Sequence, residues 1–247
     1  MSDNRFARTQ MLLGEEGINK LKNTNVMIVG LGAVGGYVLE ALARAGIGKF
    51  VLVDFDTFEE SNINRQILAL NETIGIKKTE VAKNRVLSIN PNAKITTANI
   101  FVNDETIPEI LQYSPDFVVD AIDALNPKCC LIQSLIERNI PFVSSMGAAL
   151  KTDTSKIKFG KLSNSINCSL AKFVRKRLRK REIDISKVNC VWSEEQTKLS
   201  ENAMILDDNV LSATRQRHTL GSLPTITGIF GLTIANEIIL QISGYKN

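Results

Sequence analysis

Short apolar runs alternate with longer, helix-length segments through residues 24–149 of this chain. Each run leads directly to a glycine, a serine or an acid: Val26–Val29 to Gly30, Phe50–Val53 to Asp54, Phe117–Val119 to Asp120, and Pro141–Val143 to Ser144. Strands that are apolar along their whole length are typical of a parallel sheet covered by helices on both faces. Asn126 and Pro127, as N-cap and first helical residue, predict the start of one covering helix. We therefore expect an α/β fold with a doubly wound, mostly parallel sheet.

A glycine-rich turn, Gly30-Leu31-Gly32-Ala33-Val34-Gly35-Gly36, follows the first apolar run and opens a helical segment. Glycines let the backbone turn tightly and approach a phosphate, whose charge then faces the amides of the helix N-terminus. Asp54 closes the next run, where an acid can bind ribose hydroxyls. The pattern predicts a Rossmann-like nucleotide site that uses Gly30, Gly32, Ala33, Gly35 and Asp54. By itself it fits NAD and ATP equally well.

Polar and cationic residues beyond this turn favour ATP: Asp56, Ser61, Asn62, Arg65 and Lys78. Attack on the α-phosphorus of ATP builds negative charge that Arg and Lys stabilise, whereas hydride transfer needs no such cations. Asp123, three residues after Asp120, is expected at the carboxyl edge of the sheet, where Mg²⁺ can bridge phosphate oxygens. The alternative for Arg65 and Lys78, each taken alone, is a solvated surface charge, and for Asp123 it is a helix cap.

The charge of the chain is concentrated in one segment. The formal net charge is +4, yet residues 151–190 contain twelve Lys and Arg against three acids, a local charge of +9 that leaves −5 for the rest. We expect a basic helix from Leu170 to Arg181, with Leu170, Val174 and Leu178 on its buried face, and then a loop from Trp192 to Arg217. This asymmetry predicts a polyanionic partner.

The composition, 44% hydrophobic and 23% charged residues, is sufficient for a full core. Four cysteines, two of them adjacent at Cys129 and Cys130, do not form a disulfide framework and fit a reducing compartment. The N-terminus has no signal-like apolar region, so a cytoplasmic location is expected. Residues 219–243 are expected to form a buried C-terminal helix and no membrane span, because Thr233, Glu237 and Gln241 give this apolar segment a polar stripe.

Together these motifs resemble the ubiquitin-activating-type adenylating superfamily, which includes ThiF and MoeB. The matching segments, between Arg5 and Ala149, are GLGAVGG, LVDFD, SNINRQ, GIKKTEVA, the INP of Ile89–Pro91 and VDAID. The resemblance implies that Asp54 binds the ATP ribose, that Asn62 and Arg65 bind the phosphates, that Lys78 binds the phosphate chain, and that Asp123 is the magnesium-linked acid.

The resemblance also implies a homodimer. Arg8, in the Arg5-Phe6-Ala7-Arg8 opening, matches an arginine that this family inserts into the active site of the neighbouring subunit. Residues 1–247 are then a single ThiF/MoeB-like domain, with an ATP-binding core at 24–149 and a substrate-facing region, including the basic helix and a flexible loop, at 151–217.

Within the superfamily, the chain departs from ThiF and MoeB in one respect. Those activators usually carry two CxxC pairs that bind zinc, whereas this chain has no CxxC, so we expect no structural zinc. The segments Leu170–Arg181, Asn189–Glu195 and Leu220–Pro224 instead resemble the branch that dehydrates threonylcarbamoyladenosine in tRNA.

That branch implies ATP-dependent adenylation of the threonine carboxylate, followed by ring closure within the nucleoside. The tRNA would contact Lys172, Arg175, Lys176, Arg179 and Lys180 of the basic helix. Two alternatives for this helix are a site for an acidic carrier protein with a Gly-Gly tail, whose C-terminus would be adenylated, and a merely solvated face. A non-catalytic, nucleotide-dependent scaffold is a further alternative, and the presence of Arg65, Lys78 and Asp123 argues against it.

Two further residues and two components complete the expectations. No enzyme thiol is needed for this reaction, so Cys190 is interpreted as a packing residue. His218 is interpreted as a surface or tRNA-contacting residue. A monovalent cation, Na⁺ or K⁺, and a cysteine-desulfurase or sulfur-acceptor system are further expectations that the resemblance raises.

Overall fold

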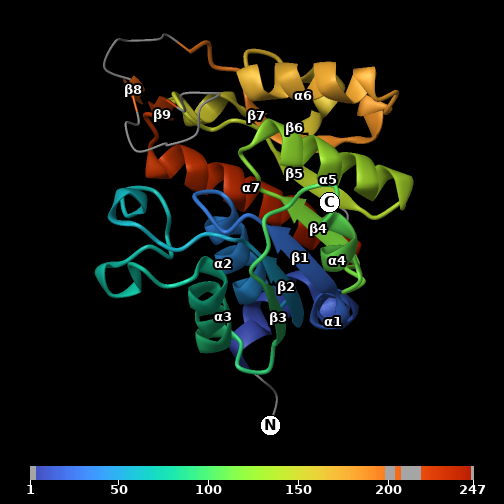
Figure 1. The fold of residues 1–247 in the computed structure, drawn as a ribbon. Helices are drawn as coiled ribbons and strands as arrows, with labels where there is room; N and C mark the ends of the chain where they lie inside the picture. The colour runs from blue at the N-terminus through green and yellow to red at the C-terminus, as the bar shows by residue number, and fades with distance from the viewer. Residues whose placement is uncertain (1–3, 198–203, 207–217, 246–247) are drawn as a thin grey trace.

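The structure, a computed structural model, describes residues 4–197, 204–206 and 218–245. Within them, seven strands form one sheet in the order β3-β2-β1-β4-β5-β7-β6, in which only β6 runs antiparallel to its neighbour (Figure 1). The strands are β1 (Asn25–Val29), β2 (Lys49–Val53), β3 (Lys94–Ala98), β4 (Phe117–Asp120), β5 (Phe142–Ser145), β6 (Ile157–Lys161) and β7 (Asn189–Ser193). A separate hairpin pairs β8 (Met204–Leu206) with β9 (His218–Leu220).

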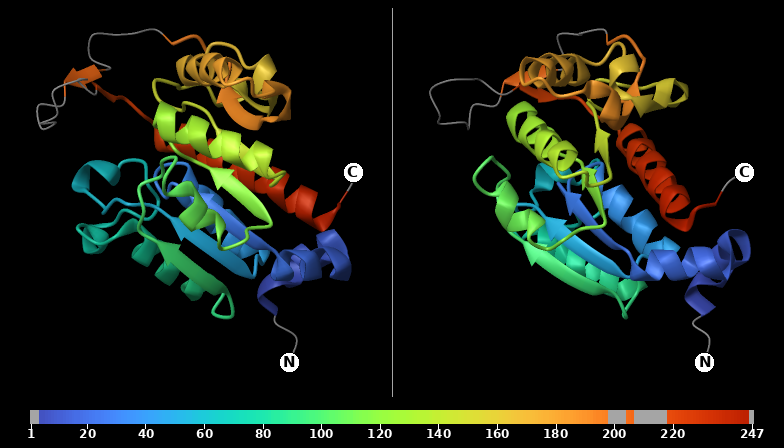
Figure 2. Two further views of the ribbon diagram at one scale, coloured as in Figure 1. Left: turned by 45° about the vertical axis from the view of Figure 1, so that its right-hand side comes forward. Right: turned by 90° about the vertical axis from the view of Figure 1, so that its right-hand side faces the viewer.

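Helices cover both faces of this sheet (Figure 2). One hydrophobic cluster packs α1 (Ala7–Asn23), α2 (Gly35–Ala45), α3 (Lys78–Ile89) and α7 (Pro224–Ser243) on one face, and a second packs α4 (Ile107–Leu111), α5 (Leu125–Glu137) and α6 (Ser169–Lys180) on the other. The predicted doubly wound α/β fold, extended at its C-terminal end and carrying a basic helix, is confirmed. The order β3-β2-β1-β4-β5 places the carboxyl ends of five parallel strands at one edge, where such sheets bind ligands.

Three local expectations differ from the structure. Asn126 does not cap α5, which begins one residue earlier at Leu125, because its side-chain oxygen accepts a hydrogen bond from Arg177 Nη1 at 2.7 Å. Trp192 lies in β7 and not in a loop, since β6 pairs with it. Met204–Leu206, also within the expected loop, form β8, and most of the remaining residues to Arg217 lie outside the described ones. The C-terminal helix begins at Pro224, after β9.

Among the described helices, α7 alone is long and apolar enough to cross a membrane by length and composition. In the structure it packs against α2, α1 and β5, and Ile226, Phe230, Ile234 and Ile238 are fully buried. Its exposed or half-buried positions include Thr233, Glu237 and Gln241, the predicted polar stripe. These contacts make α7 a core helix of this fold.

A fully buried ion pair joins β4 to α5 beneath the carboxyl edge of the sheet. Lys128 Nζ lies 2.7 Å from Asp120 Oδ2, and Ser144 Oγ of β5 donates to the same carboxylate oxygen at 2.6 Å. All three residues are 0% exposed. Asp120 Oδ1 accepts from the Ile122 amide at 3.1 Å, so the pair also holds the backbone that leads to Asp123.

We expect Lys128→Ala to destabilise the protein by about 3–5 kcal/mol, because it leaves a buried carboxylate without its cation. Urea unfolding followed by circular dichroism measures this loss. The control is a triple variant, Lys128→Met with Asp120→Leu and Ser144→Ala, which removes the whole polar group and should recover most of the stability. A Lys128→Ala protein within 1 kcal/mol of the wild type would contradict the expectation.

Candidate active site

The glycine-rich turn between β1 and α2 is packed so tightly at Gly30 and Gly35 that neither position has room for a side chain. Gly30 has φ +92°, a left-handed conformation that favours glycine, and an added Cβ would lie 2.8 Å from the Ala121 carbonyl oxygen. A Cβ on Gly35 would come within 1.8 Å of the Gly30 carbonyl oxygen. The turn therefore brings its backbone, and the amide end of α2, to an open edge of the sheet, as a phosphate site requires.

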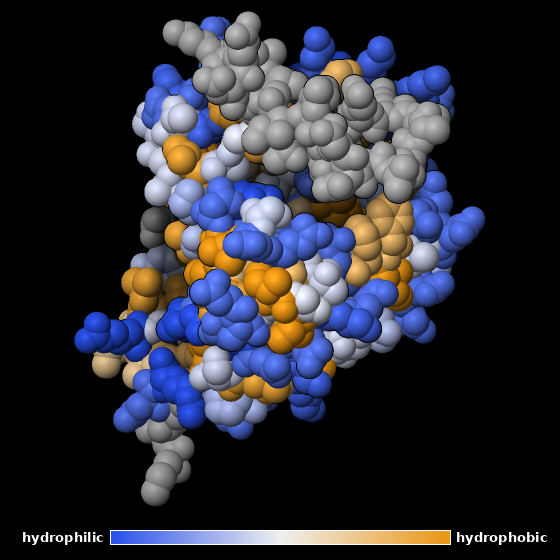
Figure 3. Space-filling model, turned by 60° about the vertical axis from the view of Figure 1, so that its left-hand side comes forward, coloured by the Kyte–Doolittle hydropathy of each residue, from blue (hydrophilic) through white to orange (hydrophobic). Residues whose placement is uncertain are grey.

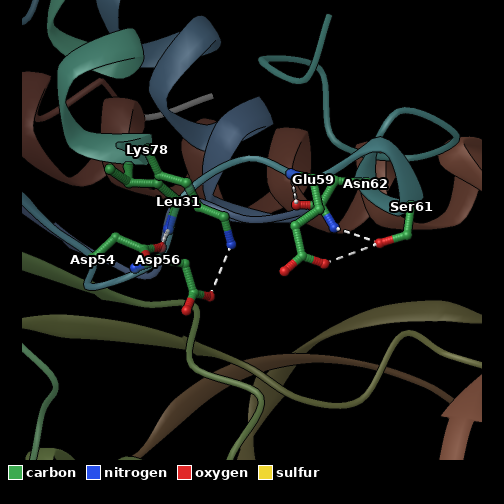
Figure 4. A network of polar contacts seen from close by, with 7 residues as sticks. All are labelled: Leu31, Asp54, Asp56, Glu59, Ser61, Asn62 and Lys78. Carbon is green, nitrogen blue, oxygen red and sulfur yellow. Dashed lines mark hydrogen bonds and ion pairs between the residues drawn. The ribbon is translucent and has the colours of Figure 1, made fainter. Parts of the chain in front are cut away.

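Asp54 fastens this turn to the end of β2. Its Oδ2 accepts from the Leu31 amide at 2.6 Å and its Oδ1 accepts from the Asp56 amide at 2.9 Å (Figure 4). Burial raises the pKa of the Asp54 carboxyl above its ordinary value, while the Lys78 charge and the two amides act in the opposite direction. The carboxylate thus holds the turn at the position where an acid would meet a ribose.

Lys78 reaches the same place from the first turn of α3. Its Nζ lies 3.0 Å from Asp56 Oδ2 and 5.9 Å from the centroid of the Phe58 ring, and the residue is only 6% exposed. The Asp56 side chain is 45% exposed, so this ion pair faces the open edge. Figure 4 shows both side chains beside Asp54 and Leu31. A cation and two carboxylates therefore converge next to the glycine turn.

The segment between β2 and α3 supplies the remaining predicted contacts. Asn62 is 8% exposed; its Oδ1 accepts from the Glu59 amide and its Nδ2 donates to Ser61 Oγ, both at 3.3 Å. Arg65 Nη1 donates to the Ser61 carbonyl and to Asn64 Oδ1, each at 2.8 Å. These bonds fix the Arg65 guanidinium to its own loop by one nitrogen, which leaves further donors of the group for a ligand.

Gln66 is a residue of this site that the sequence analysis passed over. It is 7% exposed, and the plane of its carboxamide lies against Gly32, where an added Cβ would sit 3.8–3.9 Å from all three carboxamide atoms. Its Oε1 has no hydrogen-bond partner among the described residues. Since rotation of the amide exchanges its donor and acceptor, a buried carboxamide whose oxygen lacks a partner, set against the glycine turn, fits a phosphate or its hydration shell. The position of Gln66 directly after Arg65 is the sequence feature that could have pointed to it.

Asp123 and Arg8 differ in their position relative to this group, since Ala121, two residues before Asp123, lies against Gly30 of the glycine turn. Asp123 is exposed in the segment between β4 and α5, beyond the carboxyl end of β4. Arg8 is exposed on α1. Phe6, two residues earlier, packs near Gly46 at the far end of α2 from the glycine turn. The structure therefore brings Asp54, Asp56, Asn62, Arg65 and Lys78 together and leaves Arg8 outside the site of its own chain.

The cations of α6 divide into two groups. Arg175 Nη1 donates to the carbonyl and hydroxyl of Ser165, and Arg181 Nη1 donates to Gln133 Oε1 of α5 at 3.0 Å. With Arg177 on Asn126, three arginines are half-buried and bound within the fold. The exposed cations are Lys172, Lys176, Arg179 and Lys180.

The four cysteines are free and buried. Burial raises the pKa of Cys190 to about 12 and that of Cys129 to about 11, so both thiols are protonated at neutral pH. In the part of the chain that the structure describes, no group of three or more His, Cys, Asp and Glu side chains is placed to hold a metal ion. The side chain of His218 is outside the described set, although its backbone lies in β9.

Comparison with known proteins identifies the family. The ThiF family model matches residues 6–247. The chain belongs to the ThiF family. A tRNA threonylcarbamoyladenosine dehydratase of Bacillus subtilis is 38% identical over 191 residues, covering 77% of this chain and 75% of that protein. The Escherichia coli tRNA N6-threonylcarbamoyladenosine dehydratase TcdA in complex with ATP superposes with a TM-score of 0.86 at 29% identity, covering 98% of this chain and 94% of that one.

Relatives in the other branch of the ThiF family match less of the chain. The molybdopterin-synthase adenylyltransferase of Escherichia coli is 34% identical over 151 residues, which is 60% of this chain and 59% of that protein. The structural match to the dehydratase TcdA covers 98% of this ThiF-family chain, which is more than the adenylyltransferase matches. A nicotinamide dehydrogenase, left open by the glycine turn alone, is excluded by the family.

We expect the purified protein to contain no stoichiometric zinc, because its four cysteines have no paired spacing and it has one histidine. Elemental analysis of protein purified without chelators measures this directly. A zinc-containing member of the family, prepared in parallel, serves as the positive control. One zinc per chain would refute the expectation and would favour a carrier-protein activator.

Proposed function

We propose that this chain is an ATP-dependent dehydratase that cyclises threonylcarbamoyladenosine in tRNA. The observation that supports this most is the convergence of the glycine turn, the Asp54 carboxylate and the Lys78 and Arg65 cations at one edge of the sheet. An adenylating site needs a phosphate cradle, a ribose acceptor and cations for the departing pyrophosphate. The substrate is proposed from the relatives, which are named tRNA threonylcarbamoyladenosine dehydratases.

In the proposed reaction, an oxygen of the threonine carboxylate attacks the α-phosphorus of ATP. The bond to pyrophosphate breaks, and an acyl-adenylate forms. The threonylcarbamoyl group then closes on the activated carbonyl and AMP leaves with the former carboxylate oxygen, so the nucleoside loses the elements of water. Because the second nucleophile belongs to the substrate, positioning does much of the work and the protonated, buried Cys190 is not required.

Each residue of the site has a part in this proposal. The backbone at Gly30, Gly32, Ala33 and Gly35 receives the phosphates, and Asp54 binds the ribose. Lys78, released from Asp56, and Arg65 with Asn62 and Ser61 bind the phosphate chain. Asp123, an exposed carboxylate at the same sheet edge, fits a Mg²⁺ ion, which would neutralise phosphate charge. A monovalent cation, Na⁺ or K⁺, is a further proposed component.

A homodimer completes the proposed site. Arg8 is exposed and distant from its own glycine turn, which suits an arginine that enters the site of a second copy. Figure 3 shows apolar side chains gathered in the centre of one face. Exposed apolar residues of the β2–α3 segment and of α7 suit such an interface: Ile63, Leu70, Ile74, Ile76 and Leu232. A cytoplasmic location and a cysteine-desulfurase or sulfur-acceptor partner belong to the same proposal.

The direct test incubates tRNA that carries threonylcarbamoyladenosine with the protein and MgATP, and analyses the nucleosides by mass spectrometry. The expected product is lighter by one water, with AMP and pyrophosphate formed in equal amounts. Unmodified tRNA is the control. Pyrophosphate exchange that responds only to a Gly-Gly carrier protein would instead establish the carrier-activating alternative.

We expect Arg65→Ala and Lys78→Ala each to lower AMP and pyrophosphate formation on modified tRNA by about 10²- to 10³-fold, because each removes a preorganised charge from the transition state. Asp123→Asn should lose magnesium-dependent turnover and keep the fold. Lys83→Ala, an exposed cation on the same helix as Lys78, is the matched control. Wild-type rates in the Arg65 or Lys78 variant would overturn the assignment.

We expect replacement of the exposed cations of α6 by Gln, at Lys172, Lys176, Arg179 and Lys180, to weaken tRNA binding and to flatten its salt dependence. Each phosphate contact that is removed lowers the number of counterions released when tRNA binds, whereas ATP binding should not change. Arg175→Gln is tested separately, since its bonds to Ser165 give it a structural role too. Filter binding across salt concentrations measures both effects.

The control for this charge change replaces four exposed cations elsewhere: Lys22, Lys83, Lys94 and Arg138. This variant has the same net charge and should keep its tRNA affinity. Unchanged binding in the α6 variant would show that its cations form only a solvated face. Weakened ATP binding would show that α6 belongs to the nucleotide site.

A further inference from the structure

An exposed aromatic side chain interrupts the basic face of α6. Phe173 is 53% exposed, and Lys172 and Lys176 beside it, with Lys180 two turns further along the helix, are exposed too. The helix, Ser169–Lys180, contains no acidic residue. The apolar residues that hold α6 to the protein, Ala171, Val174 and Leu178, point the other way and are fully buried.

Contacts between α6 and α5 locate Phe173 relative to the candidate active site. Arg177 bonds to Asn126 and Arg181 bonds to Gln133, so the two helices run side by side in the same direction (Figure 1). Asn126 lies in the first turn of α5, three residues after Asp123. The part of α6 before Arg177 therefore extends past the start of α5, beyond the carboxyl edge of the sheet.

Phe173 is on this projecting part and on the side of α6 that faces α5. It precedes Arg177 by four residues, and residues four apart share one side of a helix. The start of α6 is held at the same edge, because the Cys168 Sγ lies 3.9 Å from the carbonyl oxygen of Gly147, which follows β5. An exposed phenyl ring flanked by lysines thus lies at the rim of the site that contains Asp123.

We propose that Phe173 is a stacking platform for an unpaired base of the RNA substrate. This inference rests on the proposed function and specifies how the substrate is held. An aromatic ring offers a face on which any base can stack, and the flanking lysines bind the adjacent phosphates. The ring recognises an unstacked base next to the reacting nucleotide, whereas the cations alone bind any polyanion.

The same residues argue for RNA over a membrane surface. An interfacial helix inserts a broad apolar face into lipid. The apolar face of α6 is already buried in the protein core, so a single phenyl ring remains exposed outside that face. Single aromatic rings set among cations, with phosphate contacts around them, are typical of single-stranded nucleic-acid sites.

The test compares two RNAs of equal charge, a stem-loop with an unpaired loop and a fully paired duplex, in binding titrations at several salt concentrations. We expect Phe173→Ala to weaken binding of the stem-loop by about 5- to 150-fold and to leave duplex binding unchanged. The salt slope should stay as in the wild type, because stacking releases no counterions. Phe173→Trp should bind the stem-loop at least as well as the wild type, and Phe173→Leu should not recover it.

Tyr245→Ala, which removes an aromatic side chain of 37% exposure just after α7, is the matched control and should bind both RNAs normally. Equal losses for stem-loop and duplex, or no loss, would overturn the stacking proposal while tRNA binding stands. Wild-type protein that binds neither RNA would overturn the proposed function itself. A Phe173→Ala protein that loses binding to phosphatidylserine vesicles but keeps full RNA affinity would assign the ring to a lipid surface instead.

Discussion

The active-site edge depends on the close contact between Gly35 and the carbonyl group of Gly30. A Cβ at Gly35 would be 1.8 Å from that oxygen, so no other residue permits α2 to start so near the end of β1. Gly30 in turn lies against the Ala121 carbonyl, which ties the turn to the segment beyond β4. A bulkier residue at either position would separate the phosphate cradle from the backbone that carries Asp123.

The elements that follow from local chemistry were predictable from the sequence. The apolar runs that became β1, β2, β4 and β5 are each buried along their length, and Asp54 lies where its spacing from the glycine turn predicts. Local patterns could not predict partners that are distant in the chain. Arg177 takes the Asn126 side chain that could otherwise cap α5, from 51 residues away. Lys128 sits in an apolar helix, and only the fold shows that β4 and β5 place Asp120 and Ser144 beside it.

The basic helix shows how one composition can serve two physical roles. Its arginines form planar, multidentate contacts, and three of them bond to neighbouring backbone and amide groups that fix α6 against α5 and the preceding loop. Its lysines, which have flexible chains and compact charges, remain on the outside. A net charge counted from the sequence includes both the cations bound within the fold and the exposed ones, although only the exposed cations are available to a polyanion.

Another part of the positive charge of residues 151–190 lies at the open edge of the sheet. β6 is the last strand and the one antiparallel member, and its free side has no neighbouring strand in the described sheet. Lys158 and Lys161 are exposed on this strand, and Lys156 immediately precedes it. Lysines at a bare strand edge discourage pairing with the edge of another molecule, which is a route to aggregation. Some of the positive charge in residues 151–190 thereby protects the solubility of the chain, and neutral substitutions there would be costly even if RNA binding survived them.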